Sequence, residues 1–174
     1  MKKLSVIVTA LIVANSFWSC EKDDICAEGT PTTPSLIVEF YDKDNRTDLK
    51  NITNLKFYAE GFETEIDSVT GTKMSLPLKT NQPSTKWALV FNRVTTGGVI
   101  TNTDFLEFKY TTRNEYISRA CGYKTLFTLN NDSAAEPNPV HTDAADETNL
   151  WIQDITLEQT NVEDENEVHV KIYF

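Results

Sequence analysis

The sequence predicts an all-β protein: an antiparallel β-sandwich of the immunoglobulin-like kind, or a small barrel, with about seven to eight strands after an N-terminal signal helix. Two observations lead to this fold class. From Ser35 onward, apolar residues recur at every second position, and turn-forming clusters separate these runs. With 174 residues, 40% of them hydrophobic, the chain is long enough for one domain with a proper core.

The alternating segments follow one another along the predicted domain, residues 35–174. Within each segment the apolar side chains share one face of a strand, so we expect these side chains in the core. The segments are Leu36, Val38 and Phe40; Leu55, Phe57 and Ala59; Trp87, Leu89 and Phe91; Leu106, Phe108 and Tyr110; Cys121, Tyr123, Thr125, Phe127 and Leu129; Trp151, Ile155 and Leu157; and Val168, Val170, Ile172 and Phe174.

Turn-forming residues stand between these segments, at residues 42–45, 70–71, 81–84, 95–98 and 163–166. Pro77, within Leu76-Pro77-Leu78, indicates an edge strand, because proline cannot donate to a central ladder. The longest stretch without periodicity is 130–148, and a loop of that length in a compact domain is either mobile or functional.

The first residues have the layout of a secretory signal. Lys2 and Lys3 precede an apolar run from Leu4 to Val13, which is shorter than the roughly 20 residues that a membrane span needs. The alternative is a buried N-terminal helix, which the acidic stretch after Cys20 disfavours. We therefore predict a lipoprotein signal peptide at residues 1–19.

The residues around Cys20 indicate how the mature chain is attached to a membrane. Ser19-Cys20 resembles a bacterial lipobox, although Phe17 and Trp18 are bulkier than the usual pattern, as in the loose lipoboxes of Bacteroidota. We expect Cys20 to carry diacylglycerol and palmitate-type acyl chains, and two or three such chains hold a protein on a membrane. Lys22-Asp23-Asp24 resembles the export signal that sends lipoproteins to the cell surface. The predicted location is the outer membrane at the cell surface, with the periplasmic face as the alternative.

Two cysteines remain once Cys20 carries the lipid. Two unmodified cysteines in an oxidising compartment predict one disulfide, Cys26–Cys121. The alternative is two buried free thiols. Such a bond would close a loop of about 95 residues, for which the chain-entropy model gives roughly 4 to 5 kcal/mol as an upper value. Residues 20–34 are predicted to be a lipidated tether, acidic at first and then rich in Pro and Thr.

The sequence holds no familiar catalytic motif, and we expect neither enzymatic activity nor a cofactor. His169 is predicted on the outward, solvated face of the last strand, and His141 lies in the acidic loop without a nearby nucleophile pattern. Asp42-Lys43-Asp44-Asn45 with Asp48 resembles a fragment of a calcium loop, but Arg46 and a missing glycine favour a plain turn. No metal site is predicted.

Possible partners follow from charge and from surface motifs. The net charge of −10 argues against nucleic acid, which needs clustered Lys and Arg. Asp67-Ser68-Val69 and Asp132-Ser133-Ala134 match the short O-glycosylation pattern of exported Bacteroidota proteins. Tyr41, Tyr58 and Tyr173 would form a sugar-stacking platform if exposed, or core and cross-strand pairs if buried.

Three stretches carry a resemblance to a known family: Leu76–Leu78, Asp104–Tyr110 and Tyr116–Lys124. They resemble uncharacterised lipoproteins of flavobacteria and other Bacteroidota, classed as domain of unknown function 6452. The run Cys121-Gly122-Tyr123-Lys124 is the most specific marker. The resemblance implies a lipid-anchored envelope protein whose early and middle cysteines recur, which fits a disulfide, and it carries over no catalytic residue.

We therefore expect a non-enzymatic binding or structural module, held on a membrane through its lipid, with an envelope protein or glycan as its partner. Two alternatives stay open at this point. A carbohydrate-binding surface module would need a row of exposed aromatic residues on one sheet face. A small hydrolase would need His141 or His169 beside a Ser, Asp or Cys in a cleft.

Overall fold

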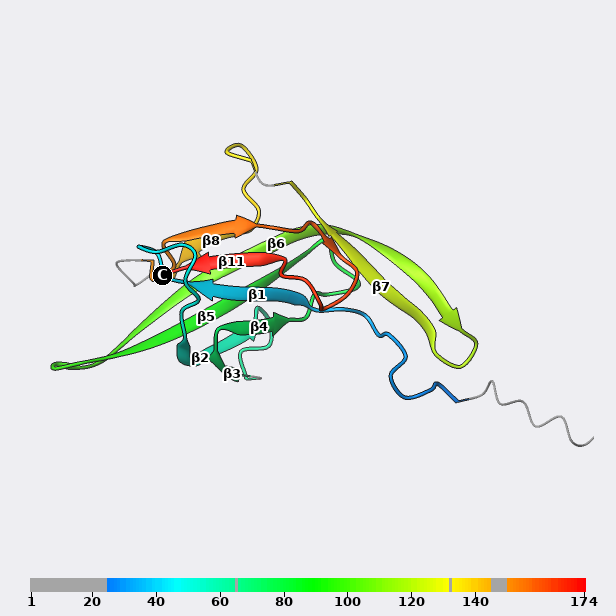
Figure 1. The fold of residues 1–174 in the computed structure, drawn as a ribbon, viewed down its shortest axis with the longest axis horizontal. Coiled ribbons are helices and arrows are strands. Elements are labelled where there is room, and N and C mark those ends of the chain that lie inside the picture. The colour runs from blue at the N-terminus through cyan, green and yellow to red at the C-terminus, as the bar shows by residue number, and fades with distance from the viewer. Residues whose placement is uncertain (1–24, 65, 132, 145–149) are drawn as a thin grey trace, which may run out of the picture. The chain divides into compact units, whose positions relative to one another are not determined.

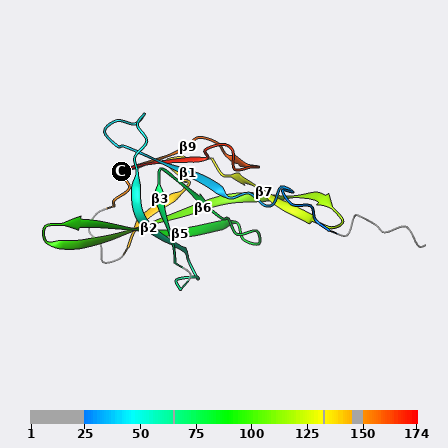
Figure 2. The same cartoon turned by 60° about the horizontal axis from the view of Figure 1, so that its bottom comes forward.

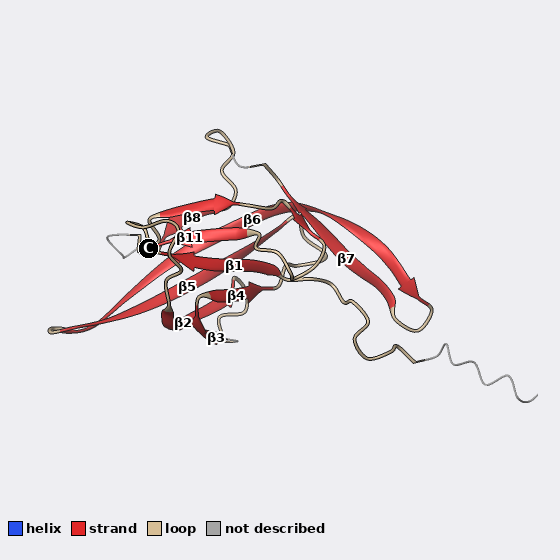
Figure 3. Cartoon of the chain, viewed as in Figure 1, coloured by secondary structure: helices blue, strands red, loops and turns tan. Residues whose placement is uncertain are grey.

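The structure is a computed structural model that describes residues 25–64, 66–131, 133–144 and 150–174. It separates into two compact units: residues 25–30 with Tyr116–Tyr123, and Pro31–Glu115 with Lys124–Phe174. Figure 3 shows strands and loops throughout the described residues, which confirms the all-β fold class. Within those residues, no helix has the length and apolar character that crossing a membrane requires.

The strands form two open sheets, which makes the fold a sandwich rather than a barrel. The four-stranded sheet has the order β4 (Lys73–Leu76), β1 (Leu36–Tyr41), β11 (Val170–Tyr173) and β9 (Asp154–Leu157). The seven-stranded sheet has the order β10 (Asn161–Val162), β7 (Gly122–Leu129), β6 (Gly98–Ser118), β5 (Ser84–Thr95), β2 (Ile52–Ala59) and β3 (Asp67–Gly71), with β8 (Val140–Asp143) also paired to β6.

The core lies between the two sheets. Figures 1 and 2 show β1 and β11 in one layer and β2, β5 and β6 in the other. Apolar side chains from both layers form one buried cluster, so the period-two pattern is confirmed along the centre of these strands. Fully burying each such side chain contributes about 1.5 to 3 kcal/mol. Members of the cluster that the sequence predicted include Leu36, Val38, Phe40, Leu55, Phe57, Leu106, Phe108, Tyr110, Val170 and Ile172.

The structure has more strands than the seven to eight predicted, because several are too short to carry a period-two signal. Strand β8 forms inside the stretch predicted to be a loop, where it pairs with Asp104–Glu107 of β6. The pairing of β1 with β11 is parallel, which an alternating pattern alone does not indicate. Strand β4 ends directly before Pro77 and lies at the edge of its sheet, as predicted.

His169 is the clearest correction to the sequence analysis. Its predicted solvated position is wrong, because the residue is only 1% exposed. Its Nδ1 accepts a hydrogen bond from the Ile37 N–H at 3.0 Å, and its own N–H donates to the Ile37 carbonyl oxygen at 3.0 Å. Its carbonyl oxygen accepts from the Glu158 N–H at 2.9 Å. The alternation failed here because β11 begins at Val170, one residue later.

Burial gives His169 a pH dependence. Desolvation lowers the pKa of His169 below its ordinary value of 6.5, although the charges of Asp164, Glu167 and Glu165 raise it in part. The unfolded chain therefore takes up a proton at a higher pH than the folded chain does. The stability that neutral His169 provides is full above pH 6.5 and is lost as the pH falls through the lower, folded pKa.

The first prediction is that His169→Asn removes this dependence. The Asn side-chain oxygen can accept from the Ile37 N–H, as Nδ1 does, but it does not titrate in this range. Urea unfolding between pH 7.5 and pH 5 should show a steeper loss of stability in the wild type than in the variant. The carboxylates titrate in both proteins, so their contribution to the pH dependence cancels in the comparison. Equal slopes would contradict the assignment.

Candidate functional site

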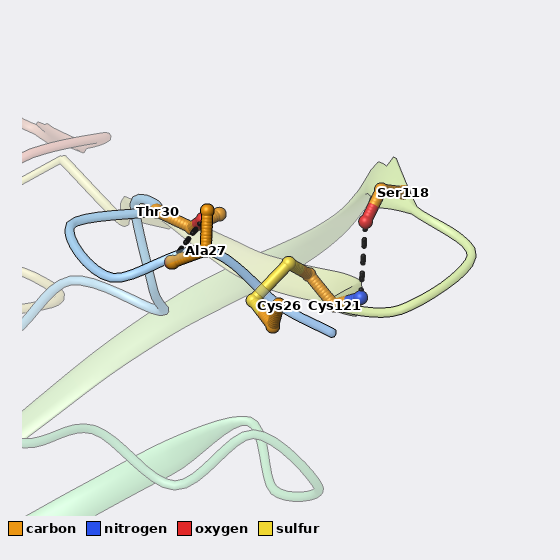
Figure 4. Close-up of a disulfide and its surroundings, with 5 residues drawn as sticks. All are labelled: Cys26, Ala27, Thr30, Ser118 and Cys121. Carbon is orange, nitrogen blue, oxygen red and sulfur yellow. Dashed lines mark hydrogen bonds between the residues drawn. A yellow bond between two sulfur atoms is a disulfide. The ribbon is translucent and has the colours of Figure 1, made fainter. Parts of the chain in front are cut away.

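The unit formed by residues 25–30 and 116–123 is organised around a disulfide (Figure 4). Cys26 and Cys121 are bonded with an S–S distance of 2.02 Å and a Cα–Cα distance of 4.9 Å. This Cα separation lies within the range of roughly 4.4 to 6.8 Å that native disulfides occupy. The predicted bond is confirmed, and the alternative of two free thiols is wrong.

The surroundings of the bond differ from the prediction. Cys121 was expected to point into the core, but it is half-buried in the turn between β6 and β7. Its N–H donates to the Ser118 Oγ at 3.0 Å, which steadies that turn. The turn interrupts the alternation, because Gly122 has a φ of 71°, a conformation that favours glycine. On the other side of the bond, the Thr30 hydroxyl donates to the Ala27 carbonyl oxygen at 2.7 Å.

The same unit exposes large apolar side chains. Ile25 is 83% exposed, Tyr116 57% and Tyr123 69%. The two tyrosine rings contact each other edge to face, with centroids 5.3 Å apart. Ile25 and Tyr116 also line one hollow of about 500 Å³. Tyr123 was predicted in the core, and this is wrong, because alternation indicates a face of a strand but not whether that face is covered.

The second prediction concerns the oxidation state. Mature protein with Cys20→Ala should show no titratable thiol when denatured without reductant, and adding Cys26→Ser should free one thiol. Reduction should lower the melting temperature, since removing such a bond from a small secreted domain typically costs about 2 to 5 kcal/mol. Two thiols that titrate before reduction would contradict the assignment of the Cys26–Cys121 disulfide.

A second cluster lies inside the sandwich, around the fully buried carboxylate of Asp104 on β6. Its Oδ2 lies 2.8 Å from His141 Nε2 and accepts the Ile152 N–H at 2.9 Å. Its Oδ1 accepts the Trp151 N–H at 3.2 Å. The carboxylate therefore joins β6, β8 and the segment ahead of β9. Burying a carboxylate is tolerated when donors satisfy its oxygens in this way.

The hydrogen bonds of this cluster connect separate segments of the fold. A hydrolase would also need a nucleophile beside its histidine that a substrate can reach, whereas the hydrogen bond described for the His141 ring is to the buried carboxylate of Asp104. His169 likewise uses Nδ1 to accept from Ile37. Asp104 was not predicted from the sequence, although a signal was present: it lies two residues before Leu106, on the same inward face.

The third prediction is that Asp104→Asn destabilises the fold by about 1 to 3 kcal/mol, the usual effect of leaving buried polar groups unsatisfied. The amide has one acceptor oxygen where the carboxylate has two, so one of the backbone N–H groups of Trp151 and Ile152 loses its partner. Urea unfolding at neutral pH measures the change.

Asp143→Asn is a matched control. Asp143 pairs with Asp104 across the β6–β8 ladder, but its buried Oδ1 has no hydrogen-bond partner within the described part of the chain. This control should change stability less than Asp104→Asn or raise it. If Asp104→Asn is as stable as the wild type, the structural role assigned to this carboxylate is wrong.

A small pocket opens beside β2 and β5. It has a volume of about 250 Å³, and its lining includes Phe62, Leu78, Lys79 and Trp87. The Trp87 Nε1 is buried there without a hydrogen-bond partner among the described residues. Lys79 Nζ lies 5.6 Å from the centre of the Phe62 ring. This pocket was not predicted from the sequence, in which Trp87 was interpreted only as a core residue.

Tyr41, Tyr58 and Tyr173 do not form the exposed sugar-stacking platform that was considered for them. Tyr41 and Tyr173 are register partners on β1 and β11, with ring centroids 5.7 Å apart. Tyr173 is buried, and the Arg46 guanidinium lies 3.9 Å from the centre of its ring. Tyr58 is half-buried on β2, in the other sheet. The cross-strand interpretation is therefore confirmed for Tyr41 and Tyr173.

The calcium-like stretch lies in the turn between β1 and β2. The Asp42 Oδ1 accepts the N–H groups of Asp44 at 2.8 Å and Asn45 at 3.0 Å. The N–H of Asn45 and the Lys50 ammonium lower the pKa of Asp42 to about 2. Asp48 Oδ2 accepts from the Asn45 amide. Among the described residues, no three His, Cys, Asp or Glu side chains come together as a metal site would need.

Several predicted sites lie outside the described residues or at their margin. Cys20, Lys22, Asp23 and Asp24 are outside them, and so is Asp132 of the second glycosylation pattern. Ser68 of the first pattern is exposed on β3, an edge strand of the seven-stranded sheet. Modification of Ser68 stays a prediction.

A comparison with protein-family models matches residues 54–174 to a family described as Family of unknown function (DUF6452). This chain belongs to that family. No curated protein and no solved structure matches it. The family match begins inside β2, so it omits β1, which nevertheless lies between β4 and β11 in the four-stranded sheet.

Proposed function

We propose that this protein is an exported lipoprotein, held on the outer membrane through Cys20, that binds or supports another component of the cell envelope. The observation that carries the proposal is the Cys26–Cys121 disulfide. Structural disulfides form and persist in oxidising compartments and are rare in the cytosol. With these two cysteines bonded to each other, Cys20 is the third, and it follows an apolar signal and a small residue, Ser19.

A binding or structural role has more support than catalysis. Both histidines of the chain are engaged within the fold, His141 with Asp104 and His169 with Ile37. Membership in a family of unknown function supplies no catalytic residue. Crosslinking on intact cells, followed by identification of what the protein captures, would name the partner.

The fourth prediction is that Cys20→Ala abolishes membrane attachment. The side chain that takes the lipid is then missing, so the protein should stay as precursor or leave the membrane fraction. Fractionation and mass measurement of the N-terminal peptide check both outcomes. Cys26→Ser is the matched control, because it removes a nearby cysteine and should keep the lipid. Normal processing and membrane retention of Cys20→Ala would falsify the proposal.

The fifth prediction tests surface display. Replacing Lys22, Asp23 and Asp24 with alanine should leave lipidation intact but reduce digestion by protease added to whole cells. Alanine at Lys43 and Asp44, two charged residues of an exposed turn, is the control and should have no effect. A wild-type protein that is already shielded from added protease would place the chain on the periplasmic face.

A further inference from the structure

We propose that the exposed face formed by Ile25, Tyr116 and Tyr123 contacts the membrane that carries the anchor, at the level of the lipid headgroups. The partner is a zwitterionic lipid surface. This inference rests on the proposed attachment at Cys20. It adds a second, non-covalent contact with the same membrane.

Ile25, Tyr116 and Tyr123 form one exposed apolar face. Exposed apolar side chains that are scattered singly need no explanation, but these three are contiguous. Tyr116 contacts Tyr123 with ring centroids 5.3 Å apart, and it lines one hollow together with Ile25. A tyrosine ring with its apolar body and polar hydroxyl suits the boundary between hydrocarbon and water, where this residue is enriched in membrane proteins.

A short covalent path joins this face to the proposed anchor at Cys20. Six residue steps separate Cys20 from Cys26, and a fully extended chain of that length reaches about 22 Å at most. That reach is about half the thickness of a typical bilayer with its headgroups, which is about 40 to 45 Å. Cys26 therefore stays close to the lipid-bearing surface, and its disulfide keeps Cys121 there too. Tyr123 follows two residues after Cys121.

The unit that carries this face has few charged residues. The charged residues in 25–30 and 116–123 are Glu28 and Arg119, which have opposite signs. The whole chain carries a net charge of −10. The two charges of this unit therefore cancel, whereas the whole protein is acidic. Neutral headgroups rather than a charged partner fit such a unit best.

The test places a reporter on this face. The mature chain, residues 20–174 with the disulfide intact, is coupled through the Cys20 thiol to a maleimide lipid in phosphatidylcholine vesicles. Tyr123→Trp adds an indole to the proposed contact. Val99→Trp is the matched control, because Val99 is 64% exposed and belongs to the other unit. The emission of Trp87 and Trp151 is subtracted by using the parent protein.

A lipid with a nitroxide near its headgroup should quench the indole that Tyr123→Trp adds and leave the one from Val99→Trp unchanged. A blue shift of the added emission on coupling to vesicles should accompany the quenching. Equal quenching at both positions, or none at either, overturns the proposal. So does crosslinking in cells of Tyr123→Trp to a protein partner without quenching by lipid, which would make the face a protein interface.

Chemical coupling makes this test independent of cellular lipidation. Membrane retention of Cys20→Ala in cells would contradict the proposed function, whereas the quenching result reports only whether the face contacts lipid. Tyr116→Ser combined with Tyr123→Ser gives a second check. In the coupled protein, with Ile25→Trp as the reporter, these substitutions should reduce the quenching, because the two rings no longer hold the face at the interface. Undiminished quenching would show that the tyrosines make no such contact.

Discussion

The pairing of β1 with β11 is the constraint on which the rest of the sandwich depends. These strands are parallel neighbours, with Val38 opposite Val170 and Phe40 opposite Ile172. Parallel neighbours need a long connection, and here nearly the entire domain forms it. The four-stranded sheet is therefore complete only when β11, the last strand of the chain, has paired with β1. The hydrogen bonds between His169 and Ile37 extend this pairing by one buried residue.

The other sheet depends on a single long strand. Strand β6 has 21 residues and pairs with β5 along one side and with β8 and β7 along the other. Its inward face alternates Leu106, Phe108 and Tyr110 with half-buried residues, so hydrophobic burial fixes its register. Asp104 continues that face as a carboxylate, and backbone N–H groups offset its loss of water. The strand thus joins apolar packing to a polar contact that reaches the segment ahead of β9.

The sequence was informative where the physical signal is local. Alternation identified the inward faces of β1, β6 and β11, because burial of one face requires period two. The same rule failed at strand ends, for His169 and Cys121, since it does not indicate where the backbone leaves the sheet. It also failed for Tyr123, whose face lacks a cover. The parallel β1–β11 pair and the Trp87 pocket depend on contacts between distant segments, which no local pattern encodes.

The disulfide was predictable for a different reason: only three cysteines occur, so one assignment to lipid left one possible pair. Its covalent connectivity also sets a load path. In a chain held at Cys20, tension from the membrane enters the fold at Cys26 and passes through the sulfur atoms to Cys121. The 95-residue interval that the bond spans, which includes β1 to β6, is bypassed. In a chain held in this way, shear acts on the turn before β7 and spares the β1–β11 pair from being peeled apart at its N-terminal end.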